Sequence, residues 1–241
     1  MRFQDLMQEQ KFTLVVSLPS NDLELAKAAL EGGADAVKVH CNVWHRASGH
    51  TFGTYEENKD FLKDLIGLCG DVPVGLVPGT SEAFITETEL QELKDMGLDF
   101  ISAYSRNLPC FAMDEPGITA AVAIGADDSE SVLDAVRDSD IAVLEASVVR
   151  GEEYGQKLTC ADLLCYSSIV KRTGKPCMVP TQKQIRPEDV KHLYRSGCKA
   201  LMIGAIVFGQ DPTPEQLRSV TAAYRAAVDA LEFCRIPRKR L

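Results

Sequence analysis

The segment Arg195-Ser196-Gly197-Cys198-Lys199-Ala200 joins the end of an expected helix to a buried apolar run that continues to Ile203. Two other stretches repeat this arrangement, Glu31-Gly32-Gly33-Ala34-Asp35-Ala36 and Asp95-Met96-Gly97-Leu98-Asp99-Phe100. In each, a glycine suited to a helix C-terminus is followed within two or three residues by a strand-like run. The repeated join predicts parallel strands that are covered on both faces by helices.

Eight apolar, β-branched runs fit this pattern: Thr13–Leu18, Ala36–His40, Val72–Val77, Phe100–Tyr104, Ile118–Ile124, Ile141–Ser147, Cys177–Thr181 and Ala200–Gly204. Helices are expected between them, at residues 22–32, 55–69, 87–96, 129–138, 160–173, 187–196 and 214–231. Eight such units predict an α/β fold, a closed (β/α)8 TIM barrel that forms one domain over residues 1–241. An open doubly wound sheet is the alternative. Residues 105–117 contain two prolines and are too short for a full helix, so we expect a degenerate fourth helix.

The composition restricts the classes of partner. A formal net charge of −9 and a pI near 5.0 argue against a nucleic-acid-binding protein, which would need a basic face. No apolar run reaches the roughly 18 residues of a membrane span, and no secretory leader is visible. The eight cysteines form no CxxC pair, so we expect free thiols and a cytoplasmic protein. We also expect a homo-oligomer, with residues 235–241 as a solvated basic tail.

Three polar residues on two strands are the candidate catalytic groups. Side chains alternate along a strand, so Lys38 and His40 point into the barrel if Val37 and Val39 face the helices. The same parity directs Glu145 inward, from the strand opposite in an eight-strand ring. A desolvated lysine could act as a base or form a Schiff base, with the carboxylate or the imidazole moving the proton. The alternative is a buried ion pair that only fills the barrel.

Other polar residues at the expected strand ends are candidates for substrate contacts. Ser17 and Arg106 lie at two of these ends, and His45 lies in the segment after the second strand. A guanidinium at Arg106 could bind a carboxylate or a phosphate, although a surface salt bridge is an alternative.

The segment His40–His50 contains three of the four histidines and the only tryptophan, Trp44. It is expected to be a loop as far as Tyr55. One hypothesis is a lid that closes over substrate, and another is an inert surface loop. A third is a metal site, because imidazole and thiolate are zinc ligands, although His40 and Cys41 should point to opposite faces of the strand. No cofactor is predicted, and a divalent metal remains the alternative.

The last part of the chain resembles a known superfamily. The pattern I-x-P-E-D-V-x-x-L-x-x-x-G at residues 185–197 and the Ile203-Gly204 turn resemble the ribulose-phosphate-binding barrels, which include sugar-phosphate epimerases, tryptophan-pathway barrels and the prenylglyceryl-phosphate synthase type. Residues 72–104 resemble the acylaminosugar-phosphate epimerases more weakly. The resemblance implies phosphate binding after the seventh and eighth strands, by Gln182, Lys183, Gly204 and Ala205. The segment Thr181-Gln182-Lys183 replaces the family's glycine pair, so we expect Lys183 to supply charge there.

These observations predict an isomerase (epimerase) or an aldolase-like lyase that acts on a small phosphorylated carbonyl metabolite. Lys38 and Glu145 would supply acid–base chemistry at the carboxyl ends of the strands. One alternative is a metal-dependent hydrolase or aldolase that uses the His40–His50 segment. Another is a non-catalytic, ligand-sensing barrel, which a filled barrel mouth would favour and an open polar pocket would oppose.

Overall fold

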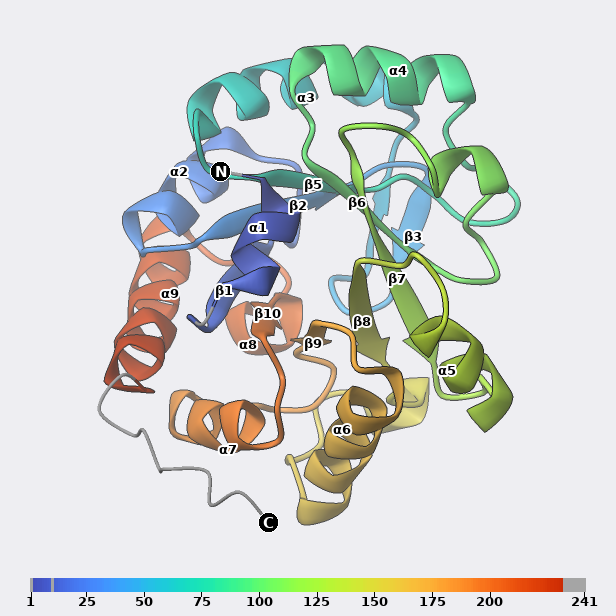
Figure 1. Cartoon of the computed structure of the whole chain (residues 1–241). Helices are drawn as coiled ribbons and strands as arrows, with labels where there is room; N and C mark the ends of the chain where they lie inside the picture. Colours follow the sequence, from blue (N-terminus) through green and yellow to red (C-terminus); the bar gives the residue numbers. More distant parts are fainter. Residues whose placement is uncertain (1, 10, 232–241) are drawn as a thin grey trace.

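The computed structural model describes residues 2–9 and 11–231, so the basic tail expected at 235–241 lies outside the described residues. A ring of strands lies at the centre, with helices packed around it (Figure 1). The barrel strands are β1 (Thr13–Ser17), β2 (Ala36–His40), β5 (Val74–Val77), β6 (Phe100–Tyr104), β7 (Thr119–Gly125), β8 (Val143–Ser147), β9 (Cys177–Pro180) and β10 (Ala200–Ile203). All neighbours are parallel, and the ring closes in the order β1-β10-β9-β8-β7-β6-β5-β2. The predicted (β/α)8 barrel is confirmed.

Helices follow the strands in the expected alternation. They are α1 (Phe3–Gln8), α2 (Leu23–Glu31), α3 (Tyr55–Cys69), α4 (Glu87–Met96), α5 (Glu130–Arg137), α6 (Cys160–Thr173), α7 (Val190–Arg195), α8 (Ala205–Phe208) and α9 (Pro214–Asp229). Short 3-10 turns lie at η1 (Cys110–Ala112), η2 (Gly151–Glu153) and η3 (Pro187–Asp189). Only η1 occupies the interval between β6 and β7, so the degenerate fourth helix is confirmed. Among the described helices, none is long and apolar enough to span a membrane.

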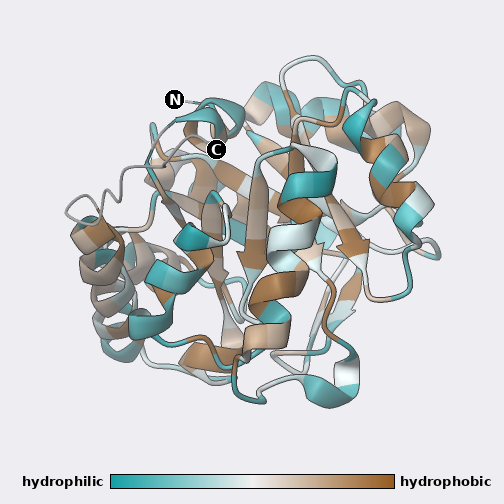
Figure 2. Ribbon diagram, turned by 60° about the horizontal axis from the view of Figure 1, so that its bottom comes forward, coloured by the Kyte–Doolittle hydropathy of each residue, from teal (hydrophilic) through white to brown (hydrophobic). Residues whose placement is uncertain are grey.

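The helices bury one face against the barrel and expose the other. Figure 2 shows hydrophilic and hydrophobic segments alternating along the surrounding helices, as expected for amphipathic helices. Leu90 and Leu93 of α4 are buried in this way, and Thr86 begins the helix with a capping box to Glu89. The inner faces of the helices and the outer faces of the strands therefore form one continuous apolar layer.

The amino-terminal end of the barrel is closed by α1, which the sequence analysis did not predict. Phe3 and Met7 of this helix are completely buried. The Phe3 ring stacks on that of Phe100, with centroids 3.8 Å apart and an angle of 14° between the planes. Both belong to an apolar cluster with inward-facing strand residues such as Val15 and Val143. This cluster forms a closed floor beneath the polar residues at the other end of the barrel.

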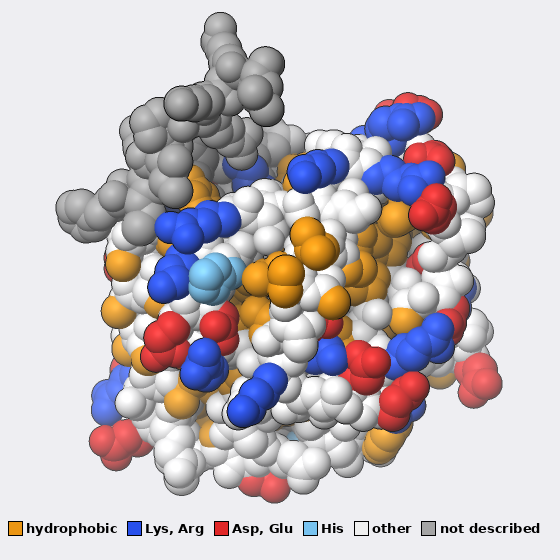
Figure 3. Space-filling view, turned by 90° about the horizontal axis from the view of Figure 1, so that it is seen from below, with side chains coloured by type: hydrophobic (Ala, Val, Ile, Leu, Met, Phe, Trp, Pro, Cys, Tyr) orange, Lys and Arg blue, Asp and Glu red, His pale blue; other side chains and the backbone are white. Residues whose placement is uncertain are grey.

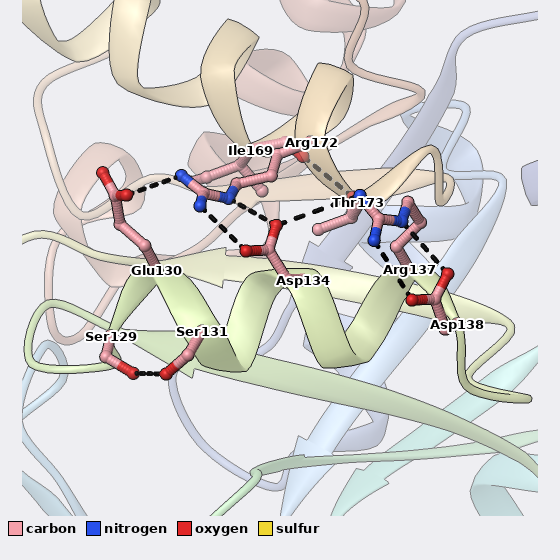
Figure 4. A network of polar contacts seen from close by, with 9 residues as sticks. All are labelled: Ser129, Glu130, Ser131, Asp134, Arg137, Asp138, Ile169, Arg172 and Thr173. Carbon is pink, nitrogen blue, oxygen red and sulfur yellow. Dashed lines mark hydrogen bonds and ion pairs between the residues drawn. The ribbon is translucent and has the colours of Figure 1, made fainter.

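Charged contacts fix α5 against α6, on the outside of β7 and β8 (Figure 4). Arg172 donates from Nε to Asp134 Oδ1 at 2.7 Å and from Nη2 to Asp134 Oδ2 at 2.9 Å. Its Nη1 lies 2.9 Å from Glu130 Oε2. In the view of Figure 3, Lys and Arg side chains lie interspersed with Asp and Glu side chains over the surface. Like the network on α5, these charges lie on the outer surface of the helical layer.

The segment after β2 differs from its prediction as a loop. It forms an antiparallel hairpin of β3 (Val43–His45) and β4 (His50–Phe52), in which His45 pairs directly with His50. Val43 opposite Phe52 is a pair of residue types that favour strands. Gly49 allows the reversal because its φ of 72° lies in the left-handed region.

Candidate active site

A cavity of about 660 Å³ opens at the carboxyl ends of the strands. All eight barrel strands contribute to its wall, through Ser17, Lys38, His40, Val77, Ser102, Tyr104, Gly125, Glu145, Ser147, Pro180 and Met202, among others. The β3–β4 hairpin adds Trp44 and His45 at the mouth. The cavity is therefore open and polar, and it lies at the end of the barrel where this fold places its active sites.

Lys38 and Glu145 meet inside the barrel, as strand parity predicted. Lys38 Nζ lies 3.5 Å from Glu145 Oε2, and the two side chains are only 6% and 8% exposed. Their strands, β2 and β8, are opposite each other in the ring. Each side chain thus reaches toward the barrel axis, and the pair lies within the polar part of the cavity.

Two serine hydroxyls hold the Glu145 carboxylate. Ser102 donates to Oε2 at 2.5 Å and Ser147 donates to Oε1 at 2.6 Å. Burial raises the pKa of this carboxyl, but the Lys38 charge and the two serine hydrogen bonds outweigh burial, so the pKa lies below its usual value. Glu145 is therefore an oriented carboxylate that is ionised at neutral pH.

The rings of His40 and His45 pack against each other beside this pair, with an angle of 36° between their planes. Their ring centroids are 4.4 Å apart, and the ring of Phe52 packs against that of His40. Burial and the neighbouring His45 and Lys38 hold the pKa of His40 well below its usual value. Burial and the Lys38 charge likewise lower the pKa of His45 to about 4. Both rings are therefore neutral at pH 7, and neither nitrogen of His40 has a hydrogen-bond partner among the described residues.

The described residues contain no group of three or more His, Cys, Asp or Glu side chains that could hold a metal. Of the residues in the metal hypothesis, His40 and His45 lie together at the cavity, but Cys41 and His50 are turned away from them. Cys41 is buried in the apolar layer on the outer side of β2. His50 contacts the Pro19 carbonyl through Nδ1 at 2.9 Å and Asp211 through Nε2 at 3.2 Å, and it does not line the cavity.

The three expected substrate contacts all line the cavity. Ser17 lies at the end of β1, and His45 lies on the hairpin with Nδ1 2.9 Å from Ser48 Oγ. Arg106 lies after β6, with its guanidinium carbon 4.3 Å from the centroid of the Tyr104 ring. The expected alternative for Arg106, a surface salt bridge, is not formed with any described residue. Its charge is free to face a ligand.

Gln182 lines the cavity, but other protein groups engage its amide. Its Oε1 accepts a hydrogen bond from the Val149 backbone N–H at 3.1 Å, and its Nε2 donates to the Tyr154 hydroxyl at 2.6 Å. The Tyr154 pKa is raised to about 12, mainly by burial. Gln182 therefore ties the loop after β9 to the loop after β8, next to the ligand space.

Lys183 departs from its expected position. Its side chain is 5% exposed, and Nζ lies 2.7 Å from Glu153 Oε2 and 3.9 Å from Asp162 Oδ1. It does not line the cavity. The chain turns after Pro180, where β9 ends, and this turn directs the lysine toward the outer loops. The structure does not bring Lys183 to the predicted phosphate position.

Gly204 and Ala205 do line the cavity, at the start of α8. The Gly204 N–H donates to Thr181 Oγ1 at 3.0 Å, so it is not free for a phosphate. The first N–H groups of a helix have no acceptor within the helix, and Ala205 and Ile206, which begin α8, line the cavity.

The sequence analysis missed several cavity residues. Ser102 and Ser147 share the inward parity of their strands, so the period-two pattern that identified Glu145 could also have identified them. Tyr154 and Arg46 lie in a loop and in a hairpin turn, and no pattern in the sequence signals their positions.

Comparison with known proteins agrees on the fold. No family model matches the chain, and no curated protein matches it. It is similar to a solved variant of the tryptophan synthase alpha-subunit from Pyrococcus furiosus, at 14% identity and a TM-score of 0.68, over 91% of this chain and 99% of that one. Thiamine phosphate pyrophosphorylase from the same organism matches at 14% identity and a TM-score of 0.64, over 91% and 96% of the two chains.

A third similar structure is the phosphoribosyl anthranilate isomerase from Thermus thermophilus. Its identity is 16% and its TM-score is 0.57, over 91% of this chain and 100% of that one. Identities this low indicate shared architecture rather than shared chemistry. The predicted resemblance to ribulose-phosphate-binding barrels is therefore confirmed at the level of the fold.

Proposed function

We propose that this protein is an enzyme of the isomerase or lyase class, which moves a proton at a carbon next to the carbonyl of a small phosphorylated metabolite. The observation that carries the proposal is the buried Lys38–Glu145 pair, 3.5 Å apart in an open cavity. Buried ionisable groups in a cleft are frequent at catalytic sites, because desolvation strengthens their interactions.

Each member of the pair has a role in this chemistry. The Glu145 carboxylate takes the proton from the carbon and returns it to a neighbouring carbon or to the product. The Lys38 ammonium stabilises the negative charge that develops on the carbonyl oxygen. In the Schiff-base variant of the same proposal, the Lys38 ammonium first gives a proton to Glu145, and the neutral amine attacks the carbonyl carbon. Glu145 returns the proton as water leaves, which gives a protonated imine that withdraws electrons instead.

The phosphate of the substrate is assigned to the start of α8. Ala205 and Ile206 line the cavity there, and their backbone N–H groups have no acceptor within the helix. The solved structures similar to this chain include a thiamine phosphate pyrophosphorylase and a phosphoribosyl anthranilate isomerase, and their names support a phosphorylated substrate. A non-catalytic barrel fits less well, because the mouth is open and lined by convergent polar groups.

Deuterium exchange tests the proposal without requiring the full reaction. The protein is incubated with phosphorylated aldoses and ketoses in D2O, and NMR follows deuterium entering the carbon next to the carbonyl. Exchange is expected with at least one compound, and Lys38→Met and Glu145→Gln should each reduce its rate about 100-fold or more. Exchange that survives in both variants would rule out these roles.

A matched control is available in Lys94→Met. Lys94 is a partly buried lysine that contacts Glu115 at 2.5 Å and does not line the cavity. This variant should retain the exchange rate of the wild type. Borohydride trapping with mass spectrometry then separates the two roles of Lys38, because only an imine is reduced to a stable adduct.

A further inference from the structure

Two arginine side chains from distant parts of the chain converge on one part of the cavity rim. Arg106 Nη1 lies 3.1 Å from the position that a Cβ on Gly125, at the end of β7, would occupy. The guanidinium carbon of Arg46, on the hairpin after β2, lies 2.9 Å from the corresponding position on Gly151, in η2 after β8. β7 and β8 are neighbours in the barrel, and Gly125 is in register with Ser147. Arg106 therefore lies at the end of β7, and Arg46 lies at the segment that follows the neighbouring strand β8.

These two arginines also differ from most other arginines in the described part of the chain by having no carboxylate partner there. Within residues 2–9 and 11–231, ion pairs are formed by Arg137, Arg150, Arg172, Arg186, Arg218 and Arg225. Arg46 and Arg106 form none with the described residues. Instead, their guanidinium carbons lie 5.8 Å and 4.3 Å from the ring centroids of Trp44 and Tyr104. Aromatic packing orients a guanidinium and leaves its edge N–H donors available to a ligand.

Acidic side chains share the rim without neutralising this pair. Asp127 lines the cavity, and its carboxylate lies 3.2 Å from Arg150 Nη2. Glu152 also lines the cavity and forms no ion pair with a described residue. Overall charge at the rim is therefore mixed. The feature that points to a ligand is the presence of two oriented guanidinium groups that face the cavity without a counter-ion.

We propose that Arg106 and Arg46 form a second anion-binding site, and that the substrate carries a second anionic group, a carboxylate or a second phosphate. This inference rests on the proposed function for the position of the first phosphate. β6, which precedes Arg106, is opposite β10, which leads into α8. A substrate that spans the cavity has one anionic end at α8 and the other at Arg106, with its reacting carbon near Lys38 and Glu145.

Calorimetric titration with matched sugar phosphates tests this site. The first pair is fructose 1,6-bisphosphate and fructose 6-phosphate, which differ by one phosphate. The second pair is 6-phosphogluconate and glucose 6-phosphate, which differ by a carboxylate. The wild type should bind the doubly anionic member of at least one pair about tenfold or more tightly. The pair that shows the preference identifies the second group as a phosphate or a carboxylate.

The Arg106→Gln and Arg46→Gln variants should lose this preference, because they should weaken binding of the doubly anionic sugars more than binding of the singly phosphorylated ones. Arg137→Gln makes the same charge change on α5, outside the cavity, and should retain the preference. Equal wild-type affinities within both pairs would overturn the inference. So would a preference that persists in Arg106→Gln, or one that Arg137→Gln also abolishes.

Binding and proton exchange are measured separately, so the two proposals fail in different ways. A preference for doubly anionic sugars, without exchange of any compound in D2O, would retain the arginine site and refute the proposed function. Exchange that depends on Lys38 and Glu145, without such a preference, would retain the proposed function and refute the arginine site.

Discussion

The Ser102 hydroxyl donates to Glu145 Oε2, the same carboxylate oxygen that faces the Lys38 ammonium. Ser147 occupies the other oxygen. Glu145 is thus held from both sides, and its remaining lone pairs are what a substrate can approach. The serines add to the effect of the lysine in lowering the pKa of Glu145, because a hydrogen bond to the ionised form favours that form.

Ser102→Ala should raise the pKa of Glu145, because the carboxylate loses one of the contacts that offset its burial. If Glu145 acts as the base, the acid limb of the pH–rate profile for deuterium exchange moves to higher pH in this variant. Ser131→Ala, on the exposed side of α5, serves as the control and should leave the profile in place. An unchanged acid limb in Ser102→Ala would show that this carboxylate does not control the rate.

The buried pair should behave as a unit in stability as well. Glu145→Gln leaves the Lys38 ammonium buried without a counter-charge, and Lys38→Met leaves a lone carboxylate. Each change should lower the free energy of unfolding by about 3–5 kcal/mol. The double variant Lys38→Met with Glu145→Gln removes both charges and should lose less than the sum of the two single changes. Urea denaturation measures all three, and strictly additive losses would argue against direct coupling.

Stability should fall in acid because of the histidines at the cavity mouth. The folded pKa of His45 is lowered to about 4, whereas an unfolded histidine titrates near about 6.5. Between these values the unfolded chain binds a proton that the folded chain excludes, so the free energy of unfolding decreases as the pH falls through this window. His45 alone should lower the free energy of unfolding by on the order of 3 kcal/mol across this window. Urea denaturation as a function of pH should give a shallower slope for His45→Gln, and an identical slope would contradict the assignment.

Gly75 on β5 makes room for the Phe100 ring inside the barrel. A Cβ on Gly75 would overlap the Cζ atom of Phe100. Gly75→Ala should therefore destabilise the protein by about 1–3 kcal/mol through overpacking. Combining it with Phe100→Leu relieves the clash, so thermal denaturation of the double variant should show a smaller loss than the two single losses added together. Additive losses would mean that the two positions are not in contact.

Strand alternation explains why part of the site was predictable. Lys38 and Glu145 lie within strands, where successive side chains point to opposite faces, so their parity predicted the contact between them. Lys183 lies beyond β9, in a turn where this alternation no longer holds, and its prediction as a phosphate ligand did not account for the turn.

Two elements, α1 and the hairpin after β2, escaped prediction for different reasons. In α1, Phe3 and Met7 are the buried residues of a short, largely polar segment, and their partners lie on the inward faces of strands throughout the chain. The hairpin after β2 depends on local pairing such as Val43 with Phe52. The histidines and Trp44 made this strand pattern hard to recognise in the sequence. Tertiary packing decides such segments, since local propensity is a weak guide over so few residues.

The pairing of β1 with β10 has a consequence for synthesis on the ribosome. Thr13 emerges well before its register partner Ala200, which is made only after the other seven barrel strands. Until then one edge of β1 has no partner strand, and the end of the barrel that α1 closes is incomplete. Ring closure and the fit of Phe3 against Phe100 are thus late events, and a nascent chain that stalls before β10 exposes an edge strand and an apolar interior to other proteins.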